Sequence, residues 1–205
     1  MKLWLPGMII VLGILFGGIG FGKEPDVKTL MGRKVVMVIA FRDFRDEEFF
    51  KPYAALTEVG AEVVVASTQL GKAKGMLGQT VSVNMLIEDV VATRFDAIVF
   101  VGGGCAQIYF DNPIAHRLAQ DAVLYRKVLG AICVAPETLA HAGVLKGVKV
   151  TGFSSIKPAL GKAGALVQNQ PVVRDGNLIT ADGPQSAGGF AAAIIEALEQ
   201  KIPAP

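Results

Sequence analysis

Four short apolar segments constrain the fold of this chain more than any other feature. They are rich in β-branched residues and do not alternate with polar positions: Lys34–Ala40, Glu62–Ser67, Ala97–Val101 and Val128–Ile132. Continuous runs of this kind are typical of parallel strands that are buried on both faces. The sequence therefore predicts one α/β domain, in which helices cover both faces of a mostly parallel sheet.

Helical segments separate these strands. Glycine follows two of these helical segments, as Gly60 and Gly143, and is a common C-terminal cap. A third segment begins with Asn112 as N-cap and a proline at its first helical position. The predicted helices are Asp46–Val59, Pro113–Tyr125, Pro136–Ala142 and about Ala187–Gln200. Gly71–Leu77 predicts a hairpin or a loop. Shorter strands are expected at 148–153, 171–175 and 178–182, the last two joined by a turn at Asp175-Gly176-Asn177.

The first 22 residues differ from the rest. Lys2 is their only charged residue, and an uncharged apolar run extends from Leu3 to Gly22. This layout is that of a secretory signal, and the run is also long enough to span a bilayer. Both readings stay open. The predicted organisation is a signal peptide or membrane anchor over 1–22, a linker over 23–33, a domain over 34–200 and a tail over 201–205, with the domain exported or membrane-anchored outside the cytoplasm.

Composition excludes several kinds of site. The net charge is +2, and no basic stripe is present, so we expect no nucleic-acid partner. Two cysteines are too few for a disulfide scaffold. Two cysteines and two distant histidines do not form a set of zinc ligands, and no phosphate-binding loop is present. No metal or other cofactor is therefore expected.

Three strand ends carry unusual residues. The strand Val128–Ile132 leads directly into Cys133 and then a helix, whose N-terminal amides and dipole favour a thiolate and lower the thiol pKa. The strand Ala97–Val101 leads into Gly102–Gly104, where backbone amides can approach a ligand as an oxyanion hole. The first strand leads into the carboxylate-rich turn 43–48. Since such ends meet at one edge of the sheet, one site is predicted there.

Each feature alone also has a purely structural explanation, such as a small buried side chain for Cys133. Together they resemble the PfpI superfamily, which includes intracellular proteases, the Parkinsonism-associated deglycase and glyoxalase-type relatives, and is related to class I glutamine amidotransferases. The resemblance rests on Ala131–Gly147, on Asp96–Gly103, and on Asp175–Thr180 followed by Gly183-Pro184 and Phe190. It covers about Lys34 to Glu199 in the same order.

The resemblance implies a flavodoxin-like three-layer α/β/α sandwich with a cysteine nucleophile elbow, assembled as a homodimer or a higher homo-oligomer. The family's nucleophile corresponds to Cys133. The oxyanion-hole amides correspond to Gly103 and Val134, and the carboxylic acid that hydrogen-bonds the sulfur corresponds to Glu48. A protonated acid at that position would stabilise a thiolate.

Other positions depart from the family pattern. Val134 stands where protease-type members carry histidine, Gln107 where they carry glutamate, and Phe153 where other relatives carry histidine. His116 and His141 are interpreted as surface residues. A cysteine protease needs a base that also protonates the leaving amine. Peptidase activity is therefore not expected.

Several functions remain open. The first is an enzyme that acts through Cys133 on small electrophiles, glyoxalase- or deglycase-like, with Glu48 as acid and base. The second is a redox or stress-response protein, in which Cys105 pairs with Cys133 or resolves its sulfenic acid, unless Cys105 merely fills space. A catalytically silent binding domain and a PfpI-type cysteine hydrolase are the remaining alternatives.

Overall fold

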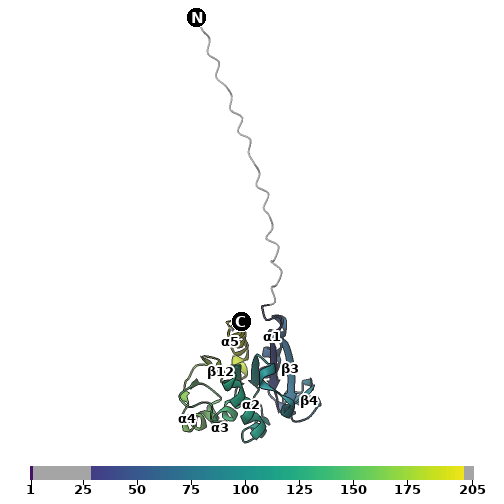
Figure 1. The fold of residues 1–205 in the computed structure, drawn as a ribbon, viewed down its shortest axis with the longest axis vertical. Helices are drawn as coiled ribbons and strands as arrows, with labels where there is room; N and C mark the ends of the chain where they lie inside the picture. The colour runs from purple at the N-terminus through teal and green to yellow at the C-terminus, as the bar shows by residue number, and fades with distance from the viewer. Residues whose placement is uncertain (2–28, 201–205) are drawn as a thin grey trace.

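Seven strands form the central sheet of the computed structural model, which describes residue 1 and residues 29–200 (Figure 1). Their order across the sheet is β11-β12-β8-β7-β1-β3-β6. The bounds are β1 Lys34–Val38, β3 Glu62–Ser67, β6 Met85–Leu86, β7 Ala97–Phe100, β8 Val128–Ile132, β11 Val172–Asp175 and β12 Leu178–Ala181. All neighbours pair in parallel except β11 and β12, which form an antiparallel hairpin at one edge. The predicted mostly parallel sheet is confirmed.

Helices cover both faces of this sheet. On one face α1 (Asp46–Glu58) packs beside α5 (Ala187–Glu199), and on the other lie α2 (Pro113–Leu124) and α3 (Pro136–His141). The short α4 (Lys157–Lys162) packs against α3. Asn112 caps α2 as predicted, since its side-chain oxygen accepts hydrogen bonds from two amides of the first turn. The three-layer α/β/α arrangement is confirmed.

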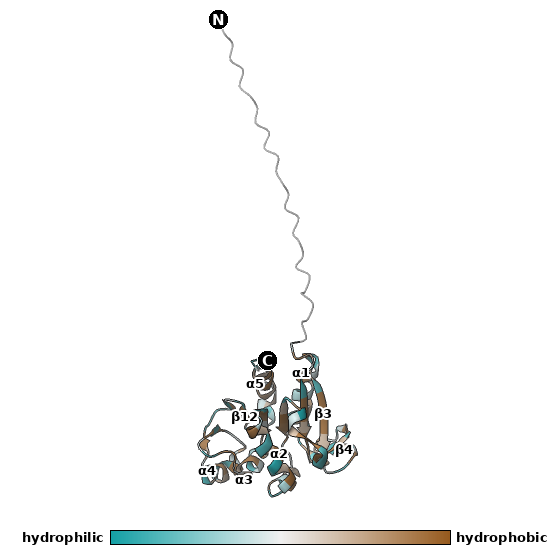
Figure 2. Ribbon diagram, in the orientation of Figure 1, coloured by the Kyte–Doolittle hydropathy of each residue, from teal (hydrophilic) through white to brown (hydrophobic). Residues whose placement is uncertain are grey.

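Two apolar cores lie between the layers. Successive residues of a strand point to opposite faces, so Val35 and Met37 of β1 face α1 and α5, while Val36 and Val38 face α2 and α3. All four are fully buried. Figure 2 shows the apolar colouring along strands such as β3. Because both faces of each inner strand are buried, every position must be apolar, which explains the runs in the sequence.

A small second sheet lies beside the first. It has the order β2-β4-β5, with β2 Arg42–Phe44, β4 Gly71–Gly75 and β5 Thr80–Val83. β4 and β5 are antiparallel, so the segment predicted as a hairpin or loop is half of a hairpin. Asp46 is fully buried at the start of α1, and it accepts hydrogen bonds from the amides of Leu77 and Gln79, which lie in the turn between β4 and β5. This carboxylate fixes the hairpin against the site described below.

The segment 148–168 differs from the prediction. The expected strand at 148–153 has only two residues, β9 (Lys149–Val150), which pairs with β10 (Leu166–Val167). The amide of Phe153 donates to the carbonyl of Cys133 at 2.8 Å, and this bond draws the chain across the carboxyl edge of the sheet instead. Short 3₁₀ helices complete the fold: Ile87–Asp89, Ala92–Arg94, Ala106–Tyr109, Ser154–Ile156 and Pro184–Ser186.

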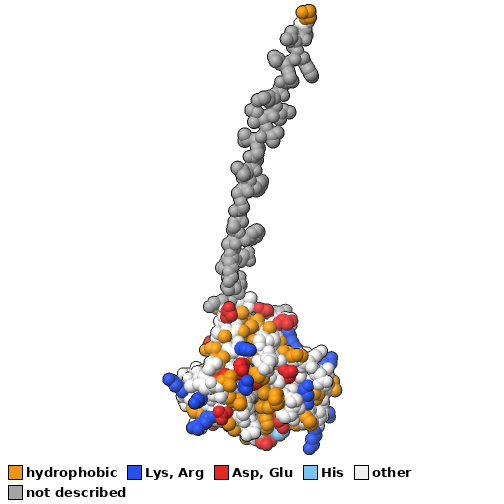
Figure 3. All heavy atoms as spheres, turned by 180° about the vertical axis from the view of Figure 1, so that it is seen from behind, with side chains coloured by type: hydrophobic (Ala, Val, Ile, Leu, Met, Phe, Trp, Pro, Cys, Tyr) orange, Lys and Arg blue, Asp and Glu red, His pale blue; other side chains and the backbone are white. Residues whose placement is uncertain are grey.

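The terminal predictions fall largely outside the described part of the chain. The structure does not describe residues 2–28 and 201–205. These ranges include nearly all of the expected signal or anchor and the whole of the expected tail. Leu30 is fully buried, and its amide donates to the carbonyl of Val59, so the folded domain includes part of the expected linker. Over residues 29–200, no helix is long and apolar enough to span a bilayer. Acidic and basic side chains are interspersed on the face seen in Figure 3.

Candidate active site

Cys133 lies on a strained turn between β8 and α3. Its φ of +64° is in the left-handed region, which a cysteine rarely adopts and which costs about 1–3 kcal/mol. Two backbone hydrogen bonds hold the turn: the Cys133 amide donates to Ala181 at 2.9 Å, and its carbonyl accepts from Phe153. The half-buried thiol therefore lies at the carboxyl edge of the sheet, as the sequence predicts. Strain at such a position is typical of functional residues.

Glycines after β7 make room for this thiol. An added Cβ on Gly102 would lie 2.5 Å from the Glu48 Oε2 atom and 2.7 Å from the Cys133 Cβ atom. Gly103 has φ of +120°, and a side chain there would also overlap the backbone of Asp43. Only glycine at position 102 therefore allows Glu48 and Cys133 to approach each other.

Glu48 is a buried acid in the first turn of α1. Its side chain is fully buried, and neither carboxyl oxygen has a hydrogen bond of ordinary geometry within the described residues. Burial raises the pKa of Glu48 to about 7, because a charged carboxylate loses its hydration. The nearby Cys133 thiol, the Arg45 charge and the Gly102 amide oppose this increase. Near neutral pH the group can therefore hold or release a proton.

The Cys133 thiol responds to this neighbour. Burial raises the pKa of Cys133 to about 12, and the negative charge of Glu48 adds to the increase, while the amides of Val134 and Gly103 oppose it. The sequence-based prediction of a lowered thiol pKa is wrong, since the six-residue α3 does not offset burial beside a carboxylate. Protonation of Glu48 removes that repulsion. The two groups therefore titrate as a coupled pair.

The remaining predicted groups surround the same atoms. The backbone amides of Gly103 and Val134 both act on the Cys133 thiol, since each lowers its pKa. Beside them opens a cavity of about 320 Å³, enough for a small carbonyl compound. Its lining comprises Gly103, Gly104, Gln107, Phe110, Val134, Glu137, Ser155 and Ile156. The loop after β7 and the turn after β8 thus both contribute to the wall, the latter through Val134, the residue that follows Cys133.

Sequence reasoning missed two charged residues here. Arg45 forms a two-pronged ion pair with Glu47, at 2.8 and 3.1 Å, and its charge also acts on Glu48. Glu137 lines the cavity and is largely buried, with 19% of its side chain exposed. An acid in the first turn of a helix is commonly a solvated residue, so only its place one turn beyond Cys133 could have indicated a role.

The two histidines lie together, between α2 and α3. Their ring centroids are 6.5 Å apart, and neither residue lines the cavity. The Nδ1 atom of His141 bonds Asp111 at 2.8 Å, while its Nε2 atom lies 3.8 Å from Glu137. His141 is exposed as predicted, but His116 is half-buried, and its ring bonds the carbonyl of Phe110. Neither is placed as a base for Cys133.

Cys105 is a free thiol, as is Cys133. Its sulfur donates to the Asp43 carboxylate at 3.6 Å. Burial raises the pKa of Cys105, and the charge of Asp43 raises it further. A thiol with a raised pKa attacks a sulfenic acid slowly at neutral pH, so these surroundings do not favour a resolving role.

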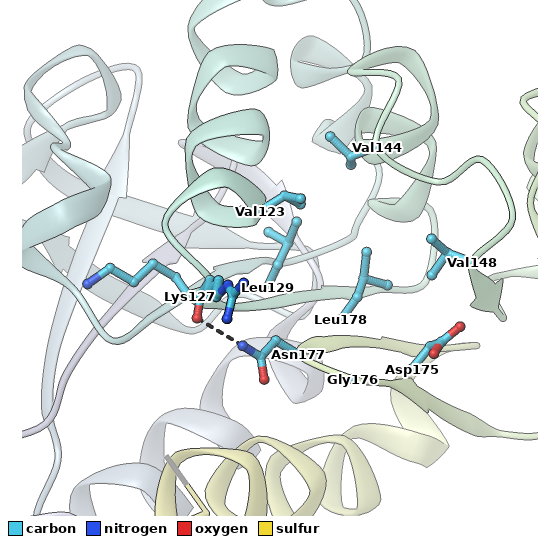
Figure 4. A pocket seen from close by; sticks show the side chains of 10 residues that line it. Val123, Lys127, Leu129, Val144, Val148, Asp175, Gly176, Asn177 and Leu178 are labelled. Atoms are coloured by element: carbon cyan, nitrogen blue, oxygen red, sulfur yellow. Dashed lines mark hydrogen bonds between the residues drawn. The ribbon is translucent and has the colours of Figure 1, made fainter. Parts of the chain in front are cut away.

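Another hollow, of about 440 Å³, lies at the opposite edge of the sheet, where β8 and β12 begin (Figure 4). Its walls are mainly apolar, formed by Val123, Leu129, Val144, Val148 and Leu178. The dashed line in Figure 4 marks the hydrogen bond from the Asn177 side chain to the Arg126 carbonyl, at 2.9 Å. Gly103 and Val134, whose amides act on the Cys133 thiol, do not line this hollow, but they line the cavity of about 320 Å³ at the carboxyl edge.

Comparisons with known proteins agree with this geometry. Residues 33–197 match the model of the DJ-1/PfpI family. The chain is 40% identical to an uncharacterised protein of Methanocaldococcus jannaschii, over 84% of this chain and 86% of that one. It is 33% identical to the deglycase PfpI of Pyrococcus furiosus, over 73% of this chain and 90% of that one. The crystal structure of a ThiJ/PfpI domain protein from Brachyspira murdochii superposes with a TM-score of 0.81 at 30% sequence identity. The match covers 82% of this chain and 98% of that one.

These relatives correct the predicted localisation. The sequence predicts an exported or membrane-anchored domain outside the cytoplasm, and this prediction is wrong. The chain matches deglycases and DJ-1 proteins along nearly their whole length, and their names describe neither exported nor anchored proteins. The prediction rested on the apolar composition of residues 3–22 alone, and such a run does not by itself distinguish a targeting segment from other apolar segments.

Proposed function

The chain belongs to the DJ-1/PfpI family, and we propose that it acts through Cys133 on small reactive carbonyl compounds, as a glyoxalase- or deglycase-like enzyme. One observation carries the proposal: the buried Glu48 carboxyl meets the Cys133 thiol beneath Gly102, beside a cavity of about 320 Å³. A pKa of about 7 suits an acid that must give and take a proton at neutral pH.

The reaction follows from these groups. The Cys133 sulfur forms a bond to the aldehyde carbon of a 2-oxoaldehyde, and the carbonyl electron pair moves to oxygen, which faces the amides of Gly103 and Val134. The thiol proton passes through Glu48 to that oxygen and gives a hemithioacetal. Glu48 then moves a proton from the former aldehyde carbon to the neighbouring carbonyl carbon, through an enediol, and a thioester results. Water hydrolyses the thioester to a 2-hydroxy acid and restores the thiol, so no external oxidant or reductant is needed.

Deglycation uses the same first bond. An amine that has added to a 2-oxoaldehyde forms a hemiaminal. The Cys133 sulfur bonds to the hemiaminal carbon as the carbon–nitrogen bond breaks, while Glu48 gives the departing amine a proton and takes up the thiol proton. The products are the free amine and the same hemithioacetal. The cavity lining contains no histidine, which supports this readily expelled amine over the amine of a peptide.

The test is the consumption of methylglyoxal and the appearance of lactate with the full-length chain. Cys133→Ser is expected to abolish turnover, because the attacking thiolate is lost. Glu48→Gln is expected to lower kcat by about 10²–10⁴, the usual contribution of an acid–base group. Cys105→Ser is the matched thiol control and is expected to retain activity. Wild type without turnover, or an active Cys133→Ser variant, would overturn the proposal. Assembly as a homodimer or higher oligomer stays a prediction.

A further inference from the structure

Glu137 is the one charged residue among the described residues that line the cavity beside Cys133. The other lining residues are neutral: Gly103, Gly104, Gln107, Phe110, Val134, Ser155 and Ile156. The Glu137 side chain is only 19% exposed, so water and salt screen its charge less than that of a surface carboxylate. The described lining of this cavity therefore has a net negative charge.

The Glu137 carboxylate has little compensation from its neighbours. Its one ion-pair partner among residues 29–200 is His141, whose Nε2 atom lies 3.8 Å from the Glu137 Oε1 atom, too far for a hydrogen bond. The other ring nitrogen of His141 bonds Asp111 at 2.8 Å. Within the same residues no group donates a hydrogen bond to the Glu137 carboxylate, so its oxygens are available to a ligand in the cavity.

Glu137 lies about one turn beyond the reactive cysteine. Its amide donates to the carbonyl of Val134 at 3.1 Å, and this bond closes the turn that leads into α3. Residues three apart in a helical turn have Cβ atoms about 5–6 Å apart. Val134 directly follows Cys133, its amide acts on the thiol, and both Val134 and Glu137 line the cavity. A small compound bonded to the Cys133 sulfur therefore lies within reach of the Glu137 carboxylate.

We propose that Glu137 determines the specificity of the site: it binds a cationic group of the substrate, so that the site prefers 2-oxoaldehyde adducts of amines that carry a second, positively charged group. The inference rests on the proposed function. A largely buried carboxylate forms strong charge-assisted hydrogen bonds with an ammonium group. Phe110 adds an aromatic ring to the same lining, and the π-system of such a ring attracts cations. The same negative charge repels substrates that carry a carboxylate, and repulsion of this kind is a common source of specificity.

The first test measures the effect of this charge on the thiol and does not depend on turnover. Cys133 is alkylated with neutral iodoacetamide or with iodoacetate, an anion of nearly the same size; in both reactions the sulfur displaces iodide. The full-length chain carries Cys105→Ser, so that Cys133 is the thiol measured. We expect Glu137→Gln to lower the ratio of the iodoacetamide rate to the iodoacetate rate at least about threefold, because the anion is no longer repelled.

The controls separate charge from structure. Glu137→Asp keeps the negative charge, and Glu88→Gln removes an exposed carboxylate outside the cavity lining; both are expected to keep the ratio of the parent chain. The charges of Glu48 and Arg45 also act on the thiol, but they are common to all these chains and cancel in the comparison. An equal ratio in the parent and in Glu137→Gln would overturn the assignment of Glu137.

The second test compares the methylglyoxal adducts of putrescine, butylamine and γ-aminobutyrate. These amines have similar lengths, and their far ends are positive, neutral and negative. We expect kcat/KM of the wild type to fall in that order, by at least about threefold at each step and mainly through KM, and Glu137→Gln to bring the values together. Equal kcat/KM values in the wild type, or an order that persists in Glu137→Gln, would overturn the proposal. A failure to turn over any of the adducts would refute the proposed function, while the alkylation ratios would still decide whether Glu137 selects by charge.

Discussion

Replacing Glu48 with glutamine is expected to change how the stability of the domain depends on pH. Burial raises the pKa of this carboxyl from 4.5 to about 7. Below pH 4.5 the group is protonated in both the folded and the unfolded chain and contributes nothing. As the pH rises, the unfolded chain loses its proton first, so the free energy of unfolding falls until the folded carboxyl also ionises near pH 7.

The size of the effect follows from the pKa change. A rise from 4.5 to about 7 corresponds to about 3 kcal/mol of unfolding free energy that the wild type loses between pH 4 and pH 8. Glutamine has the same shape and does not titrate, so its variant lacks this loss. In a domain of this size, 3 kcal/mol corresponds to about 6–12 °C in Tm. The free energy of unfolding of Glu48→Gln, relative to that of the wild type, is therefore expected to rise by about 3 kcal/mol between pH 4 and pH 8.

The assay is urea unfolding of the full-length chain at one-unit steps from pH 4 to pH 8. Groups elsewhere titrate equally in both proteins, so they cancel in the difference between wild type and variant. Glu199→Gln removes an exposed carboxyl at the end of α5 and gives the baseline. If wild type and Glu48→Gln run parallel within about 1 kcal/mol, Glu48 is not a buried acid with a raised pKa. The assigned coupling to the Cys133 thiol would then fail as well.

Substitutions at three further positions test structural contacts that the structure shows for a glycine, a buried carboxylate and a helix cap. Gly102→Ala should cost about 1–3 kcal/mol in urea unfolding, because its methyl group overlaps Glu48 and Cys133; an unchanged midpoint would contradict the close approach. Asp46→Ala should cost about 2 kcal/mol and speed hydrogen exchange at the two turn amides that it binds, so continued protection there would refute the clamp. Asn112→Ala should lower stability by about 1 kcal/mol in thermal melts while Asn112→Asp does not, since aspartate also caps; equal losses would count against the cap.

Local chemistry explains which elements the sequence predicts well. The strand predicted at Val128–Ile132 has those bounds in the structure, because a strand buried on both faces must be apolar throughout. The N-cap at Asn112 is equally local, since its side chain bonds amides two and three residues ahead. By contrast, β2 is a three-residue strand with two exposed polar positions, and its pairing partner in β4 lies some thirty residues away. No local pattern indicates such an element.

The candidate site divides in the same way. The sequence places Cys133, Gly103 and Val134 at strand ends, because parallel strands bring their carboxyl ends to one edge. Glu48 came only from a family resemblance, since an acid in the first turn of a helix resembles any solvated acid. The sequence also gave no signal that Arg42 lies beside Lys74, because a parallel pairing of β2 with β4 brings together two segments some thirty residues apart.

The sequence by itself determined which segments form the buried strands and the covering helices, and where the turn that presents the thiol lies, since these depend on neighbours within a few residues. Only the tertiary structure decided the protonation chemistry. The sequence predicts that the helix after Cys133 lowers the thiol pKa, whereas the pKa rises to about 12. Burial is the largest cause of the rise, and the Glu48 carboxylate adds to it. Glu48 belongs to a helix that begins more than 80 residues earlier in the chain, and glycine at position 102 allows it to approach the thiol. Dehydration and charge repulsion depend on distance in space, which sequence spacing does not report.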